Sequence, residues 1–229
     1  MGTQSLGESW YNSFQFKLEK RFSQGLSFLV SYTASKTMEA VDFLNPQNAA
    51  PSRELTDFDV PQRLMISGIY EFPVGPKKRW LNQGIASHII GGWAFNWMST
   101  LQRGLPISYS GSYYIYGDPK LSSGQTLNHW FDTSPGIWVV RPPDTLRTSK
   151  LLSSTIRSDS APQLDVVLIR SFRIREGHRF QFKASAFNVS NTPIFSSPNT
   201  SPSSNLFGVV PITQRNLPRS VELAFRYTF

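Results

Sequence analysis

Long runs in which apolar and polar residues alternate are the feature that most constrains this chain. Between Trp10 and Phe22 the even positions carry mostly Trp, Phe and Leu, whereas the odd positions carry Tyr, Ser, Gln, Lys, Glu and Arg. A period of two places successive side chains on opposite faces of a β-strand. The run is also longer than the ~5–6 residues usual for strands of globular proteins. The sequence therefore predicts long strands with one apolar and one polar face.

The same alternation recurs along the chain and predicts about seven antiparallel strands and no helix. The expected strands lie near residues 10–22, 25–37, 61–72, 92–103, 163–174, 178–190 and 219–229. Their lengths are close to the ~9–11 residues with which a tilted strand crosses a bilayer. The predicted fold is all-β, an antiparallel transmembrane β-barrel segment. We expect the barrel to be incomplete, because bacterial barrels of this kind have an even number of strands.

The connections between the expected strands alternate in length. Short turns follow the first and fifth strands, whereas long loops are expected at 38–60, 104–162 and 191–218. Transmembrane barrels have short periplasmic turns and longer outer loops. We therefore expect the three long loops to face outside and the C-terminus to lie in the periplasm. Whether Ile137–Val140 forms a further short strand is left open by the sequence.

Composition limits the class of protein further. The 229 residues include no cysteine and carry a net charge of +8, with 14% aromatic and 17% charged residues. Disulfides and cysteine-ligated metals are thereby excluded, and a chain rich in aromatics and poor in charge is not expected to be disordered. No apolar run approaches the ~18 residues of a transmembrane helix. No signal peptide begins the chain, so we expect it to start within a longer exported protein.

Patterns of catalysis and metal binding are not found. His88, His129 and His178 lie in separate segments, and none is spaced to share a metal with another. Asp57 and Asp59 are spaced so that they can bind a divalent cation in a long loop, but a solvated loop is the favoured interpretation. Phosphate-binding loops and nucleophile motifs are also missing. We expect neither an enzyme nor a cofactor nor a metal site.

Most basic residues of the strands fall on the polar face. A charge on the lipid face costs ~2–4 kcal/mol at the bilayer midplane, so we expect these side chains to face the lumen. They are Lys17, Arg21, Arg63, Arg173, Arg179, Lys183 and Arg226. Arg170 shares the apolar face and is expected near the periplasmic interface, where its side chain can reach water. Nucleic-acid binding needs basic and aromatic residues on one face, so no nucleic-acid partner is expected.

Four motifs carry a resemblance to a known family. Three of them are Tyr70-Glu-Phe-Pro-Val-Gly, Gly91-Gly-Trp-Ala-Phe and Leu101-Gln-Arg-Gly-Leu-Pro-Ile. The fourth comprises Phe187, Asn188, Asn191, Pro193 and Phe195. They resemble the barrel of TonB-dependent receptors, most closely the Oar-like branch, whose plug is preceded by a carboxypeptidase-regulatory-like domain. The end of the chain is similar to the outer-membrane insertion signal, carried here by Val221, Leu223, Phe225, Tyr227 and Phe229.

The resemblance implies a receptor in the outer membrane of a Gram-negative bacterium, with a plugged barrel of ~22 strands. This chain would supply part of the wall and the extracellular ligand-gating loops. The implied partners are outer-membrane lipid, the remaining barrel and plug, TonB and the barrel assembly machinery. Candidate ligand contacts in the longest loop are Tyr113, Tyr114, Tyr116, Trp130 and Trp138. Two alternatives remain open, a soluble or surface all-β binding module of the carbohydrate type and a small passive porin-like barrel.

Overall fold

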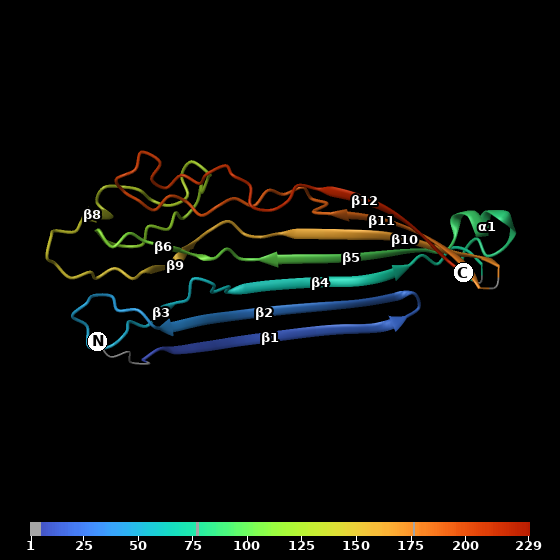
Figure 1. The fold of residues 1–229 in the computed structure, drawn as a ribbon, viewed down its shortest axis with the longest axis horizontal. Helices are drawn as coiled ribbons and strands as arrows, with labels where there is room; N and C mark the ends of the chain where they lie inside the picture. The colour runs from blue at the N-terminus through green and yellow to red at the C-terminus, as the bar shows by residue number, and fades with distance from the viewer. Residues whose placement is uncertain (1–5, 77, 176) are drawn as a thin grey trace.

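The computed structural model describes residues 6–76, 78–175 and 177–229, and it confirms an all-β fold (Figure 1). Seven long strands pair antiparallel in the order β1-β2-β4-β5-β10-β11-β12. They are β1 (Glu8–Ser23), β2 (Leu26–Ala40), β4 (Gln62–Glu71), β5 (Trp93–Gln102), β10 (Gln163–Arg175), β11 (His178–Phe187) and β12 (Ser220–Thr228). Their ends differ from the expected ranges by at most three residues, as where β11 stops at Phe187 instead of residue 190.

Shorter elements lie in the connections. Strand β3 (Glu54–Leu55) pairs with β2, β6 (Pro106–Ser108) pairs with β9 (Leu152–Arg157), and β7 (Tyr113–Ile115) pairs with β8 (Trp138–Val140). The strand left open at Ile137–Val140 is therefore present as β8. The prediction that the chain has no helix is wrong, since α1 spans Gly84–Ile90. With seven residues, α1 is too short for a helical period to stand out against the neighbouring glycines.

The two ends of the sheet differ, as Figure 1 shows. The tight turn between β1 and β2, helix α1 and the C-terminus lie at one end, on the right of that view. At this end Gln24 and Gly25 take φ of 53° and 80°, the left-handed pair that a two-residue hairpin turn requires. The connections 41–61, 103–162 and 188–219 gather at the opposite end. We call these the short-turn end and the long-loop end.

The strand register sorts side chains into rows, each running across the sheet on one face. One apolar row consists of Phe16, Tyr32, Leu64 and Leu101, and the next contains Leu18, Val30, Ile66, Ser99 and Leu164. The row between them, on the opposite face, contains Lys17, Ser31, Met65, Thr100 and Gln163. Alternation along each strand is thus converted into one continuous apolar face and one polar face.

Gly68 shows how closely this apolar face is packed. It pairs with Trp97 across β4 and β5, and a Cβ atom at Gly68 would lie 2.3 Å from the indole ring. The indole ring therefore lies directly on the backbone of Gly68, where any larger residue would displace it. The ring also stacks on Phe95, with the two centroids 5.8 Å apart. A strand glycine at this point gives an aromatic side chain close access to the neighbouring backbone.

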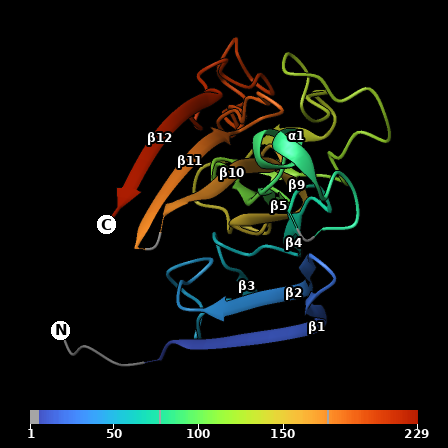
Figure 2. The same cartoon turned by 90° about the vertical axis from the view of Figure 1, so that its right-hand side faces the viewer.

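The sheet forms a single curved layer, seen from the short-turn end in Figure 2. Among the residues that the structure describes, Ala40 is the only buried hydrophobic residue in a long strand. The apolar face is open instead, with Phe14 at 65% and Phe225 at 67% exposure. Among the described residues, β1 and β12 are the two edge strands of the sheet. The sheet is therefore an open wall, and no described part of the protein packs against its apolar face. The hydrophobic core lies elsewhere, in the connections at the long-loop end.

Candidate functional site

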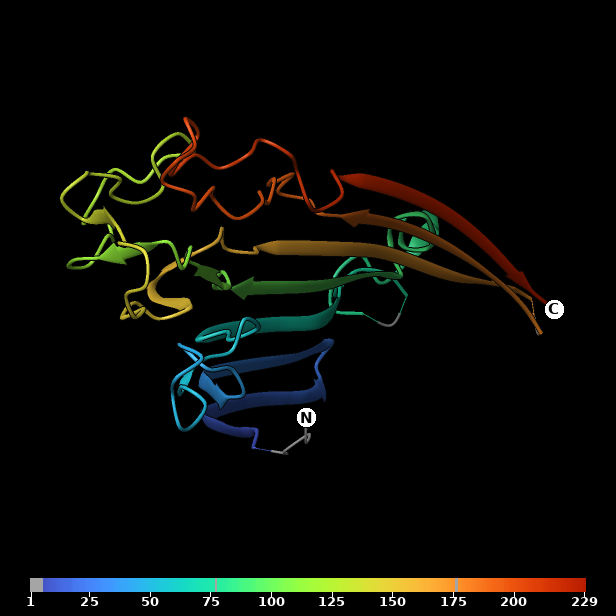
Figure 3. The ribbon, with the colours of Figure 1, turned by 60° about the vertical axis from the view of Figure 1, so that its left-hand side comes forward.

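The connections at the long-loop end fold together into what we call the loop layer, comprising residues 41–61, 103–162 and 188–219 (Figure 3). Its centre is a cluster of Ile107, Phe131, Trp138 and Ile156, each at most 6% exposed. Phe207 contributes from the third connection, and its ring centroid lies 4.9 Å from that of Trp138 in an edge-on arrangement. The longest connection is therefore a small packed unit.

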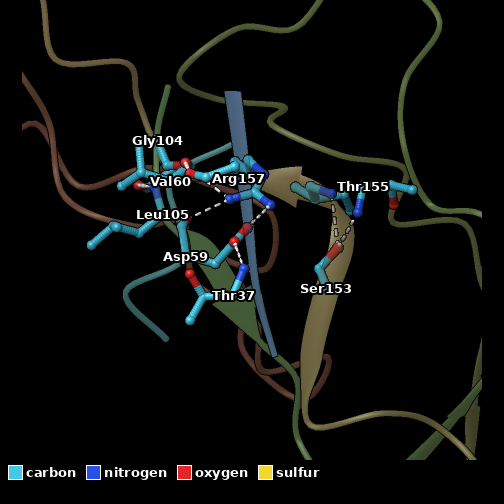
Figure 4. Close-up of polar contacts among 11 residues, drawn as sticks. Thr37, Asp59, Val60, Gly104, Leu105, Ser153, Thr155 and Arg157 are labelled. Atoms are coloured by element: carbon cyan, nitrogen blue, oxygen red, sulfur yellow. Dashed lines mark hydrogen bonds and ion pairs between the residues drawn. The ribbon is translucent and has the colours of Figure 1, made fainter. Parts of the chain in front are cut away.

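A buried ion pair joins two parts of this layer (Figure 4). Arg157 Nη2 lies 2.6 Å from Asp59 Oδ2, with the Asp59 side chain only 1% exposed and that of Arg157 16% exposed. Arg157 Nη1 also donates to the Asp59 carbonyl at 2.8 Å and to the Gly104 carbonyl at 3.3 Å. The second carboxylate oxygen of Asp59 accepts from the Thr37 amide at 2.7 Å. Each of the two carboxylate oxygens thus accepts a hydrogen bond from a protein group, as a buried charge requires.

Two further links connect the same loops. Asn45 donates to the Arg147 carbonyl at 2.9 Å and accepts from the Arg147 amide at 2.6 Å. The Leu151 amide donates to Glu54 Oε2 at 2.5 Å. Burial lowers the pKa of the Arg147 guanidinium from its usual value. Residues 41–61 and 103–162 are therefore held as one body by side-chain to backbone contacts spread along both segments.

Residues 56–61 are also attached to the wall. The Thr56 amide donates to the Thr37 carbonyl at 3.2 Å, and Ser35 donates through its amide to Pro61 and through its hydroxyl to Val60. Thr56 and Asp59 are each 1% exposed, yet Phe58 between them is 63% exposed. Burying a phenylalanine stabilises a fold by ~1.5–3 kcal/mol relative to leaving it exposed, and this segment does not make use of that gain at Phe58.

Phe58 borders a cleft of about 580 Å³ on the polar face of β1 and β2. The cleft is lined chiefly by hydroxyl and amide side chains, with Tyr11 on the side of β1. Glu39 and Arg63 lie toward opposite ends of it, because they are six residues apart in the β2 register. Neither the cleft nor the ion pair could be predicted from the sequence. The only sequence signal was the acidic stretch with Asp59, and its partner Arg157 lies 98 residues away.

The family model of an outer membrane beta barrel domain matches residues 1–222. The chain belongs to this family. It is therefore an outer-membrane β-barrel protein of Gram-negative bacteria, and the open apolar face of the wall is the face toward lipid. No curated protein and no solved structure matches the chain.

For an outer-membrane barrel protein, the position of each charge matters. By register, Lys17, Arg63, Lys183 and Arg226 lie on the face opposite the apolar rows. Arg179 pairs with Thr228 on the same face, whereas Arg21 falls where the β1–β2 register shifts. The side chain of Arg173 lies outside the described residues. Lys17 is paired with Glu19 at 3.1 Å on the exposed surface, where such pairs contribute little.

Arg170 lies on the apolar face of β10, between Leu168 and Phe172, and this position would direct its charge toward lipid. Its register partners are Trp93 and Phe182, both aromatic. Its Nη2 donates to the His88 carbonyl of α1 at 2.6 Å, and its guanidinium lies 5.5 Å from the Trp93 ring centroid. The unexpected helix α1 thus supplies a partner for this cation at the short-turn end, and aromatic rings cover its sides.

The five aromatic residues considered as ligand contacts have different surroundings. Trp138 is 6% exposed within the loop-layer core and donates through its indole to the Asp132 carbonyl at 2.7 Å. Trp130 packs against the same core and donates to the Arg157 carbonyl at 2.7 Å. Tyr113 and Tyr114 belong to β7 and are half-buried. Tyr116 is 58% exposed and has the most accessible ring of the five.

The fourth motif has a structural explanation. Asn188 and Asn191 both take φ of 49°, a left-handed conformation that asparagine tolerates better than most residues. Asn188 Nδ2 donates to the Leu217 carbonyl at 3.0 Å, and Asn191 Oδ1 accepts from the Arg219 amide at 3.0 Å. These contacts close the connection 188–219 at its base. They set the end of β11 beside the start of β12.

The C-terminal residues that resemble an insertion signal lie on one edge of the wall. Val221, Leu223, Phe225 and Tyr227 share the apolar face of β12, and each is more than half exposed. Phe229 follows the strand and is 89% exposed.

Within the residues that the structure describes, no helix is long and apolar enough to cross a membrane. The described part of the chain also contains no group of three or more His, Cys, Asp or Glu able to hold a metal ion.

Proposed function

We propose that the chain forms part of the barrel wall of a TonB-dependent receptor of the Oar-like branch. The observation that carries the proposal is the open sheet, with β1 and β12 at its two ends. In lipid, each unpaired backbone group of an open edge costs several kcal/mol, so a membrane sheet must close. The four receptor-like motifs support a larger receptor barrel as the structure that completes it. Its remaining strands, plug and TonB are the partners that this proposal requires.

The proposal assigns an orientation to the wall. Short turns of outer-membrane barrels face the periplasm and long connections face outside. The loop layer then faces the extracellular space, where it gates or recognises a bulky solute. Because 41–61 and 103–162 are joined by a buried ion pair, any opening of the gate moves these segments together. The family assignment contradicts the alternative of a soluble binding module.

The test is purification from outer membranes in mild detergent after cross-linking in cells. We expect the 25.9 kDa chain within a particle large enough for ~22 strands, cross-linked to TonB. A closed barrel made of this chain alone, insensitive to loss of TonB, would overturn the proposal in favour of the small passive barrel. A large barrel that never contacts TonB would overturn the receptor assignment.

A companion test concerns the end of the chain. Phe229→Ser should slow insertion into the outer membrane, because the assembly machinery is proposed to read this terminal aromatic. Leu217→Ser is a matched control, since Leu217 is also strongly exposed, at 82%, but lies before β12. Equal insertion of wild type and Phe229→Ser in a pulse-chase measurement would contradict the signal assignment.

A further inference from the structure

The cleft on the polar face of β1 and β2 has the dimensions of a site for a linear ligand. One end is the register row of Gln15, Thr33 and Arg63, and the other is the row of Ser9 and Glu39. Six residues of strand separate these rows, which at ~3.3 Å per residue is about 20 Å. The cleft is therefore an elongated groove of about 580 Å³ that runs along the strands at the long-loop end.

Two aromatic rings border this groove. Tyr11 on β1 is 58% exposed and Phe58 is 63% exposed. Phe58 belongs to a fixed segment, because Thr56 and Asp59 on either side of it are buried and bonded to β2. Its exposure is thus imposed by the fold. A fixed, accessible ring beside polar groups offers a flat apolar surface to a ligand.

The remaining lining is neutral and rich in hydroxyl groups. Ser9, Thr33, Ser35 and Thr37 contribute hydroxyls along one strand pair, and Val60 is the single aliphatic side chain of the lining. Thr56 also lines the groove, and its hydroxyl oxygen is buried without a hydrogen-bond partner among the described residues. One cation and one anion, at opposite ends, leave no net charge. The lining therefore does not select for charged or strongly apolar ligands.

We propose that this groove binds a linear oligosaccharide. Sugar rings have an apolar C–H face that stacks on aromatic rings and a rim of hydroxyls that pair with hydroxyl and amide side chains. An extended peptide is a poorer match, because it brings backbone N–H and C=O groups that need partners. The backbone of β2 cannot supply them, since β2 pairs with β1 on one side and with β4 on the other. The free edge of β1 is the edge that the proposed barrel pairs with its next strand.

The inference deepens the proposed function by naming a substrate class, and it relies on that function only for placing the groove on the extracellular side. Binding at equilibrium in detergent needs neither TonB nor an energised membrane. A failure to bind oligosaccharide is therefore distinguishable from a failure of the receptor assignment.

The test uses the protein purified from outer membranes, with maltoheptaose and cellohexaose as probes in isothermal titration calorimetry. We expect saturable binding of at least one probe. Tyr11→Ala and Phe58→Ala should each weaken it at least tenfold, whereas Tyr11→Phe should stay within threefold, because stacking needs the ring and not the hydroxyl. Phe14→Ala is the matched control, since this residue lies on the lipid face of the same strand, and its binding should be unchanged.

Three results would overturn the proposal. The first is that neither probe binds the wild-type protein saturably. The second is that binding persists unchanged in both alanine variants, which would place the sugar elsewhere. The third is that a decapeptide binds in the groove, with a dependence on Tyr11 and Phe58, whereas neither oligosaccharide binds there. Thermal unfolding of each variant in the same detergent checks that the loop layer remains folded.

Discussion

The wall and the loop layer are built on opposite principles. In the wall, alternation exposes an apolar face, and Ala40 is the only buried hydrophobic residue among the described residues of the long strands. In the loop layer, Phe131 and Trp138 are enclosed at 0% and 6% exposure. Lipid is the apolar partner of the wall, because an outer-membrane barrel meets hydrocarbon where a soluble sheet would meet a second layer. The loop layer stands in water and has to supply its own core.

This difference predicts that the loop layer can be unfolded separately from the wall. Phe131→Ala should destabilise the loop layer by about 3–5 kcal/mol, because it opens a cavity in a fully enclosed position. We expect faster cleavage of residues 103–162 by protease in detergent, with unchanged strand content by circular dichroism. Val140→Ala, at a position 66% exposed, should change stability by less than ~0.5 kcal/mol. If the loop layer and the wall unfolded together in Phe131→Ala, they would be a single cooperative unit.

The ion pair tests how the two regions are joined. Asp59→Asn leaves the Arg157 guanidinium largely buried without its carboxylate, which costs about 3–5 kcal/mol. Because Asp59 also accepts the Thr37 amide, we expect faster hydrogen exchange at Thr37 as well as loosening of 103–162. Glu19→Gln removes the exposed pair with Lys17 and should cost only ~0–1 kcal/mol. Equal effects of the two substitutions would mean that the buried pair does not join the loop layer to the wall.

The two faces of the wall provide the third test. Ile66 belongs to an apolar row, whereas Met65 beside it lies on the polar face. Ile66→Lys should cost ~2–4 kcal/mol, as for a charge on the lipid face, and should reduce the folded fraction in lipid vesicles measured by electrophoretic mobility before and after heating. Met65→Lys should insert nearly as well as wild type. If Met65→Lys impaired insertion more than Ile66→Lys, the lipid and lumen faces would be the reverse of those described.

Much of the wall follows from the sequence, because strand periodicity is local. Each of the seven long strands carries its own alternation, and the position of β10 could be predicted without knowing that it pairs with β5 across 60 intervening residues. Helix α1 could not be predicted, since its residues carry no recognisable period. The apolar outer face could also be predicted from the sequence, because every second residue of a strand lies on the same face of an antiparallel sheet.

The candidate site was decided by tertiary structure. Asp59 and Arg157 are 98 residues apart in the chain, and nothing in either neighbourhood marks the other as its partner. The same holds for Phe58, which looks like an ordinary loop aromatic until its neighbours are seen to be buried and bonded to β2. Local alternation determined where the strands lie and which way they face. Long-range contacts among aperiodic loops determined which side chains meet, because only the folded chain brings those segments within bonding distance.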